Sequence, residues 1–106
     1  MTSGTQQGLT GVQILESLRE HDEPLKKYSV RRIALFGSYA RSEETSASDI
    51  DFLVDFERPT YDNFYNLIEY LENLFGKKVE VLTPIALETM RVPEVAERIR
   101  QSLVYA

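Results

Sequence analysis

The clearest periodic pattern in the chain is a helical stripe between residues 60 and 76. Its apolar positions fall at steps of three and four, which is the spacing of one face of an α-helix. Thr60 is suited to cap the start of this helix, and Gly76 is suited to end it. The stripe consists of Phe64, Leu67, Ile68, Leu71, Leu74 and Phe75.

Strict alternation of apolar and other residues predicts a β-strand at residues 49–56, because successive side chains of a strand point to opposite faces. Residues 29–36 and 78–82 predict two further strands, and the first of these is apolar enough to be central. In the alternating strand, one face would carry Ile50, Phe52, Val54 and Phe56, and the other Asp49, Asp51, Leu53 and Asp55.

Weaker signals predict the remaining helices. A first helix is expected from Leu9 to about Glu20, followed by a break at Pro24. Residues 38 to about 43 can form a short helix after the first strand. Thr83 before a proline, and Pro93, each indicate the start of another helix. The apolar residues expected to face inward are Val12, Leu15 and Leu18 in the first helix and Val95, Ile99 and Leu103 in the last.

Strands that alternate with helices predict an α/β (α+β) domain, in which helices pack on a small sheet of about three to four strands. Both parallel and antiparallel pairing are compatible with this order. Residues 1–8 are expected to form a flexible N-terminal tail and residues 9–106 a single domain.

Composition narrows the classes of function. Acidic residues outnumber basic ones by 17 to 12, which gives a net charge of −5 and argues against nonspecific binding to nucleic acid. The chain has no cysteine, so disulfides and thiolate chemistry are excluded. It also lacks a long apolar run or a signal-peptide core, so we expect a cytoplasmic protein without membrane contact.

The candidate chemistry lies in one frame: Gly37-Ser38, ten intervening residues, then Asp49-x-Asp51. Glycine lets a ligand approach the backbone, and a helix that begins at Ser38 would offer free N–H groups to phosphate. Taken alone, each half has an ordinary reading, a capped turn or a solvated strand face. Together, after one strand and on the next, the two halves predict a triphosphate site beside a metal site.

Two carboxylates on one strand face repel each other, by roughly 4 kcal/mol at 4 Å and an effective dielectric of about 20. A divalent cation would remove this repulsion, and oxygen ligands favour Mg²⁺ or Mn²⁺. Glu80 would join Asp49 and Asp51 if its strand lies beside theirs; otherwise it is an exposed strand residue. Arg41 could reach a phosphate or remain a surface charge.

The residues Leu35 to Arg41, Ser48 to Phe56 and Lys78 to Pro84 resemble the minimal nucleotidyltransferase (MNT) family of the DNA polymerase β superfamily. The resemblance implies that family's fold and a nucleotidyltransferase activity. Gly37 and Ser38 would hold the β- and γ-phosphates of ATP, with Arg41 nearby. Asp49, Asp51 and Glu80 would be the catalytic carboxylates and would bind two Mg²⁺ ions.

The chain departs from the family pattern at two positions. Glu80 stands where the family usually has aspartate, and Ser42 stands where many relatives have glycine. By resemblance, the acceptor would be a hydroxyl, typically of tyrosine, on a HEPN-domain toxin, and the chain would act as its antitoxin. The alternatives are an antitoxin that neutralises its partner by binding alone, and an enzyme that modifies a small molecule or an RNA end.

Overall fold

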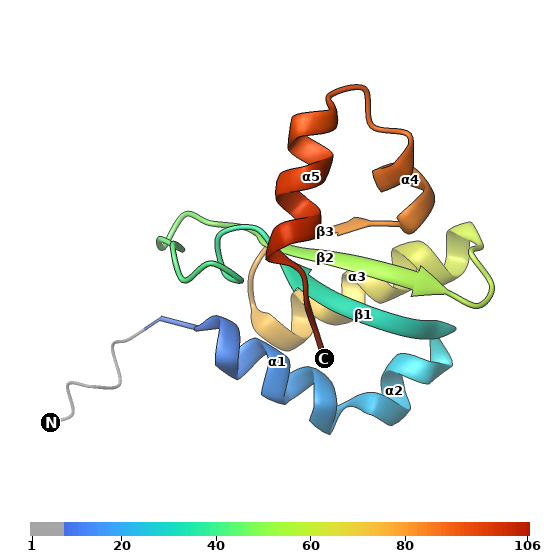
Figure 1. Cartoon of the computed structure of the whole chain (residues 1–106). Helices are drawn as coiled ribbons and strands as arrows, with labels where there is room; N and C mark the ends of the chain where they lie inside the picture. The colour runs from blue at the N-terminus through green and yellow to red at the C-terminus, as the bar shows by residue number, and fades with distance from the viewer. Residues whose placement is uncertain (1–7) are drawn as a thin grey trace, which may run out of the picture.

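A computed structural model describes residues 8–106 (Figure 1). The predicted tail at residues 1–8 lies, except for Gly8, outside the described residues. In order along the chain, the elements are α1 (Gly11–Glu20), α2 (Asp22–Lys27), β1 (Val30–Phe36), β2 (Ile50–Phe56), α3 (Tyr61–Phe75), β3 (Val79–Leu82), α4 (Pro84–Glu88), α5 (Pro93–Ser102) and β4 (Val104–Tyr105).

The four strands form one mixed sheet in the order β3-β2-β1-β4. The neighbours β1 and β2 are antiparallel, whereas β2 and β3 are parallel. The predicted fold class, a small mixed sheet with helices packed on it, is confirmed, and the strand directions that the sequence left open are now fixed. As a result, the C-terminal end of β1 and the N-terminal ends of β2 and β3 meet at one end of the sheet.

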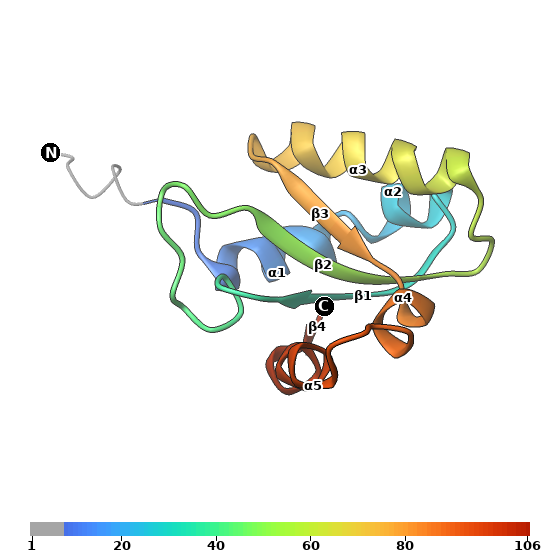
Figure 2. The ribbon, with the colours of Figure 1, turned by 90° about the horizontal axis from the view of Figure 1, so that it is seen from above.

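Both faces of the sheet are covered, by different helices (Figure 2). On one face, Phe52 and Val54 pack with Ile14 of α1 and Leu67 of α3 in the larger of two buried clusters. On the other face, Leu53 packs in a smaller cluster with residues of α4 and α5. The alternation predicted for residues 49–56 is therefore confirmed, and it leaves the aspartates on the face that carries α4 and α5.

The predicted helix boundaries at Thr60, Gly76 and Thr83 are also confirmed. The Thr60 side chain accepts a hydrogen bond from Asn63 N at 3.1 Å, and Gly76 ends α3 in the left-handed conformation. The Thr83 side chain accepts from Ala86 N at 3.3 Å and so caps α4. Within residues 8–106 no helix is both long and apolar enough to span a membrane.

Three details predicted for the first and last helices are wrong. Pro24 does not end the helical region but lies in the first turn of α2, where a missing N–H group costs nothing. Val12 is 66% exposed because α1 buries positions 14 and 18 instead. Val95 is 44% exposed, and the neighbouring Ala96 takes the buried position of α5.

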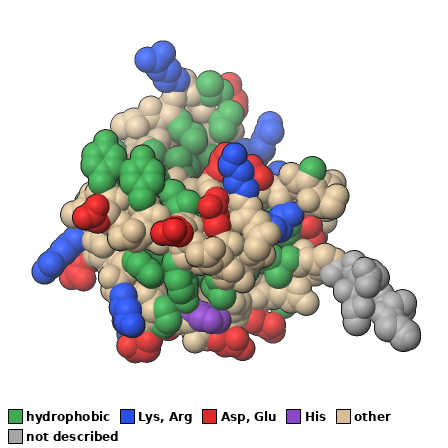
Figure 3. All heavy atoms as spheres, turned by 180° about the vertical axis from the view of Figure 1, so that it is seen from behind, with side chains coloured by type: hydrophobic (Ala, Val, Ile, Leu, Met, Phe, Trp, Pro, Cys, Tyr) green, Lys and Arg blue, Asp and Glu red, His purple; other side chains and the backbone are tan. Residues whose placement is uncertain are grey.

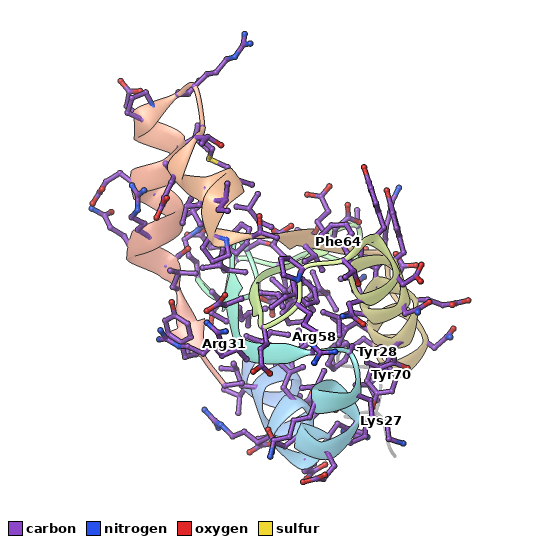
Figure 4. The ribbon with its side chains drawn as sticks, turned by 90° about the vertical axis from the view of Figure 1, so that its right-hand side faces the viewer. Lys27, Tyr28, Arg31, Arg58, Phe64 and Tyr70 are labelled. Carbon is purple, nitrogen blue, oxygen red and sulfur yellow. The ribbon has the colours of Figure 1, made fainter. Side chains whose placement is uncertain are left out.

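The end of the sheet away from the aspartates is fixed by contacts between distant segments. Tyr28, which ends α2, lies beside Tyr70 of α3 with the ring centroids 5.4 Å apart (Figure 4). Ser29 adopts a positive φ of 67°, and its hydroxyl accepts a hydrogen bond from Arg58 N at 2.7 Å. These contacts join the start of β1 to the segment that follows β2.

Candidate active site

Gly37 brings the backbone at the end of β1 directly against Asp51. Phe36, the last residue of β1, pairs with Asp51 across the antiparallel ladder. Gly37 then turns the chain with a φ of 78°, a conformation that favours glycine. A Cβ atom at this position would clash with Asp51 Oδ2 and would lie 3.1 Å from Asp51 Cγ. The backbone of Gly37 therefore lies in close contact with the carboxylate of Asp51, a group of the protein itself.

The short helix predicted at residues 38–43 is wrong; these residues form a hydrogen-bonded turn. Arg41 N donates to Gly37 O at 3.2 Å, and Glu43 N donates to Ser38 O at 2.8 Å. Ser42 has a positive φ of 59°, which an α-helix cannot contain, and Tyr39 is buried in the core with 3% of its surface exposed. Any anion at Ser38 would consequently be held by the amides and hydroxyl of a turn rather than by a helix N-terminus.

Ser42 has a φ of 59°, in the left-handed region. Glycine would occupy this region without strain, whereas serine reaches it at some cost in free energy. The fold thus accommodates serine at position 42 in place of the family's glycine, and Ser42 N still donates to Tyr39 O at 3.5 Å.

The three predicted carboxylates lie on adjacent strands. Asp49 immediately precedes β2, and Asp51 pairs in register with Glu80 of β3. Residues in register on neighbouring strands share a face and are separated by about 4.8 Å. Glu80 is exposed, whereas Asp51 is half-buried. Within residues 8–106, however, no group of three or more acidic or histidine side chains is arranged so that it could hold a metal ion.

Burial raises the pKa of Asp51 to about 6, and the negative charges of Glu80 and Asp49 add to this increase, while Arg41 lowers it. Asp51 thus lies in a partly desolvated environment, close to other negatively charged carboxylates. A hard divalent cation such as Mg²⁺ prefers carboxylate oxygens and would relieve this repulsion. The donor chemistry of Asp49, Asp51 and Glu80 therefore fits such a cation.

Arg41 and Lys77 both hold the turn and loop that connect β1 to β2. Arg41 Nε donates to Glu43 Oε1 at 3.0 Å. Lys77 Nζ donates to the carbonyl of Ser46 at 3.1 Å. No local pattern could have revealed this contact, because the two residues are 31 positions apart.

We expect Asp51→Asn to stabilise the metal-free protein at neutral pH. A carboxyl group whose pKa is higher in the folded state favours folding when protonated, so its stabilising effect is lost as pH rises from about 4 through 6. Relative to wild type, the variant's free energy of unfolding should therefore be nearly unchanged at pH 4 and about 1 kcal/mol higher at pH 7.5, after allowance for partial exposure of Asp51. Urea unfolding in the presence of a chelator at both pH values measures this.

Asp55→Asn is the matched control for this experiment, because Asp55 lies on the same face of β2. Its carboxylate is 3.9 Å from Arg31 NH1, so removing its charge should not stabilise the protein. If the two variants showed the same pH-dependent gain, crowding at Asp51 would not be the cause.

Comparison with known proteins identifies the family of the chain. A family model described as a nucleotidyltransferase domain matches residues 13–105. A Methanocaldococcus jannaschii protein, named as a proposed protein adenylyltransferase, is 44% identical over 97 residues, which cover 88% of this chain and 94% of that one.

Solved structures also share the fold. A proposed minimal nucleotidyltransferase matches with a TM-score of 0.62 and 29% identity, covering 85% of this chain and 93% of that one. A toxin-antitoxin structure with AMP-PNP matches with a TM-score of 0.59 and 19% identity, covering 92% and 72%. The family resemblance seen in the sequence is confirmed by these matches.

Proposed function

Since the chain belongs to the nucleotidyltransferase domain family, we propose that it transfers AMP from ATP to a hydroxyl group on a partner protein. The acceptor we propose is a tyrosine of a HEPN-domain toxin, which the chain would neutralise as its antitoxin. The observation that carries the proposal is the register of Asp51 with Glu80 beside the Gly37 turn. This arrangement supports the proposal, because the carboxylates that would serve the reacting centre lie beside a turn whose amides would bind phosphate.

Each reacting group has a candidate residue. The amides of the turn that begins at Gly37, with the Ser38 hydroxyl and Arg41, would bind the β- and γ-phosphates of ATP. Asp49 and Asp51 would hold Mg²⁺, which when bound neutralises phosphate charge and orients the triphosphate. Glu80, exposed at the edge of the site, would accept the proton of the incoming hydroxyl.

The proposed reaction is a single in-line displacement. The acceptor oxygen forms a bond to the α-phosphorus of ATP, and the bond from that phosphorus to the β-bridging oxygen breaks. Pyrophosphate leaves with the electron pair, and the hydroxyl proton passes to Glu80 and then to solvent. The products are an AMP ester of the acceptor and pyrophosphate.

The relatives support the choice of AMP and of a protein acceptor. The M. jannaschii relative carries the name of a proposed protein adenylyltransferase, and the toxin-antitoxin structure holds an ATP analogue. The net charge of −5 is compatible with a basic partner.

We expect the purified chain to label its partner when incubated with Mg²⁺ and ATP that is radioactive at the α-phosphate. The proposed acceptor, a HEPN-domain toxin, is the partner to use, with the modified residue identified by mass spectrometry. ATP labelled at the γ-phosphate is the control, and it should leave no label, because pyrophosphate departs.

A stable complex of the two proteins without any α-label would contradict the proposal. It would instead favour an antitoxin that acts by binding alone. The exposed position of Glu80 and its extra methylene relative to aspartate are the features that favour this second function.

A further inference from the structure

The strand β3 has a free edge beside the candidate site. The hydrogen bond from Ile50 N to Lys78 O, 3.1 Å long, fixes which residues of this parallel strand face β2. By the alternation of a parallel ladder, Glu80 and Leu82 direct their N–H and C=O groups toward β2, and Val81 directs its groups outward. Seen from above in Figure 2, no helix covers this edge.

One outward group of β3 already has a partner, which supports this assignment. Val79 N donates to Glu72 Oε2 of α3 at 3.1 Å. No turn, loop or side-chain hydrogen bond within residues 8–106 involves Val81. The backbone N–H and C=O groups of Val81 are therefore free to pair with another strand.

An apolar cavity lies at the far end of the same edge. It has a volume of about 250 Å³. Two of its rings, from Tyr61 and Tyr65, are 79% and 59% exposed and stack with centroids 5.8 Å apart. Figure 3 shows exposed hydrophobic side chains gathered among acidic ones on the face opposite that of Figure 1. The residues that line the cavity include Phe56, Pro59, Tyr61, Phe64, Tyr65 and Thr83.

We propose that an extended segment of the acceptor protein binds to β3 as an added strand. This inference rests on the proposed function and specifies how its acceptor is held. The acceptor hydroxyl would come from the residue opposite Glu80, and an apolar side chain three residues away would enter the cavity beside Thr83. The same spacing applies to either direction of the added strand.

The spacing follows from strand alternation. Glu80 shares a face with Asp51, while Val79 and Val81 belong to the cluster on the opposite face. Three residues beyond Glu80, Thr83 has returned to the face of Val81, and it lines the cavity with residues of α3. An added strand alternates in the same way, so its residues at positions i and i+3, about 10 Å apart, would meet Glu80 and the cavity respectively.

The position of Glu80 favours the acceptor over a second copy of the chain as the occupant. Any strand that pairs with β3 comes within one strand spacing, about 4.8 Å, of the carboxylate proposed to take the acceptor proton. A basic, extended segment would also be attracted to Asp49, Asp51 and Glu80. Main-chain pairing provides affinity, and a side-chain pocket at a fixed spacing provides specificity.

Val81→Pro is the variant that tests this edge. Proline removes an N–H group that points outward, and edge strands accept proline. We expect at least a tenfold higher KM for the HEPN-domain partner in the α-label assay, with AMP-PNP affinity close to wild type. Val81→Thr keeps both shape and N–H group, so it is the matched control and should transfer AMP normally.

Tyr65→Ala tests the cavity in the same assay and should also raise the KM for the partner, whereas Tyr65→Phe should not. If Val81→Pro labels the partner with the wild-type KM, the added-strand inference is overturned and the proposed function stands. If the wild-type chain itself transfers no AMP, it is the proposed function that fails.

Amide exchange gives a readout that needs no variant. In the isolated chain, the Val81 amide should exchange rapidly, and the Glu80 and Leu82 amides, which face β2, should be protected. Adding the partner without ATP should slow exchange at Val81. Protection of Val81 in the isolated chain that grows with protein concentration would show that a second copy occupies the edge, and would contradict the proposal.

Discussion

Replacing Asp49 and Asp51 together with asparagine is expected to reduce AMP transfer by about three orders of magnitude or more. The two carboxylates are the proposed ligands of Mg²⁺, whose stabilisation of transition-state charge is worth several kcal/mol. Each 1.36 kcal/mol corresponds to a factor of ten in rate. Transfer of α-label from ATP to the partner protein measures this loss, and calorimetry should show weaker binding of Mg²⁺-ATP.

The control for this double variant is Asp55→Asn combined with Glu57→Gln. This variant changes the net charge by the same amount. Its two substituted residues lie at the other end of β2, where Asp55 faces Arg31. It should retain near wild-type transfer. Equal losses in the two double variants would mean that overall charge, and not a metal site at Asp49 and Asp51, accounts for the effect.

The second large effect is expected from Gly37→Ala. An alanine at a φ of 78° is strained by about 1–2 kcal/mol, and its Cβ atom would clash with the Asp51 carboxylate. Relief requires the turn or the aspartate to move, and a displacement of about 1 Å at a reacting centre can cost roughly 100-fold in rate. We therefore expect about a 100-fold loss of AMP transfer, with weaker AMP-PNP binding measured by calorimetry.

Gly76→Ala separates backbone strain from the clash. Gly76 has a similar φ of 66°, but a Cβ atom there would have no neighbour within 4 Å. The control should lose about 1 kcal/mol of folding free energy and keep its activity. If the two alanine variants were equally active, the close approach of Gly37 to Asp51 would have no role in the reaction.

Elements whose signal is local were predictable from the sequence. The helix α3 has a continuous apolar stripe with a cap at each end, so its bounds at Tyr61–Phe75 follow directly from the sequence. The strict alternation of β2 was similarly sufficient to place Asp49 and Asp51 on one face. In both cases the local preference and the final packing agree.

Features that depend on distant partners were not predictable. The turn after Gly37 has a helix-like sequence, but it contains a left-handed residue at Ser42 and buries Tyr39 in the core. The short strand β4 exists because Val104 and Tyr105 pair with Leu35 and Ala34, about 70 positions away. Two further long-range features are the hydrogen bond from Lys77 to Ser46 and the register of Asp51 with Glu80. Only the register was predicted, and the prediction depended on β3 lying beside β2.

The mixed directions of the sheet also have a consequence for the order in which the site forms. The antiparallel strands β1 and β2 are joined by a 13-residue loop, whereas β3 can pair with β2 only after α3 has folded back across the sheet. Closing the shorter loop costs less chain entropy. We therefore expect the turn at Gly37 and the two aspartates to come together before Glu80 joins them, because loop closure favours the pairing of β1 with β2 over that of β2 with β3.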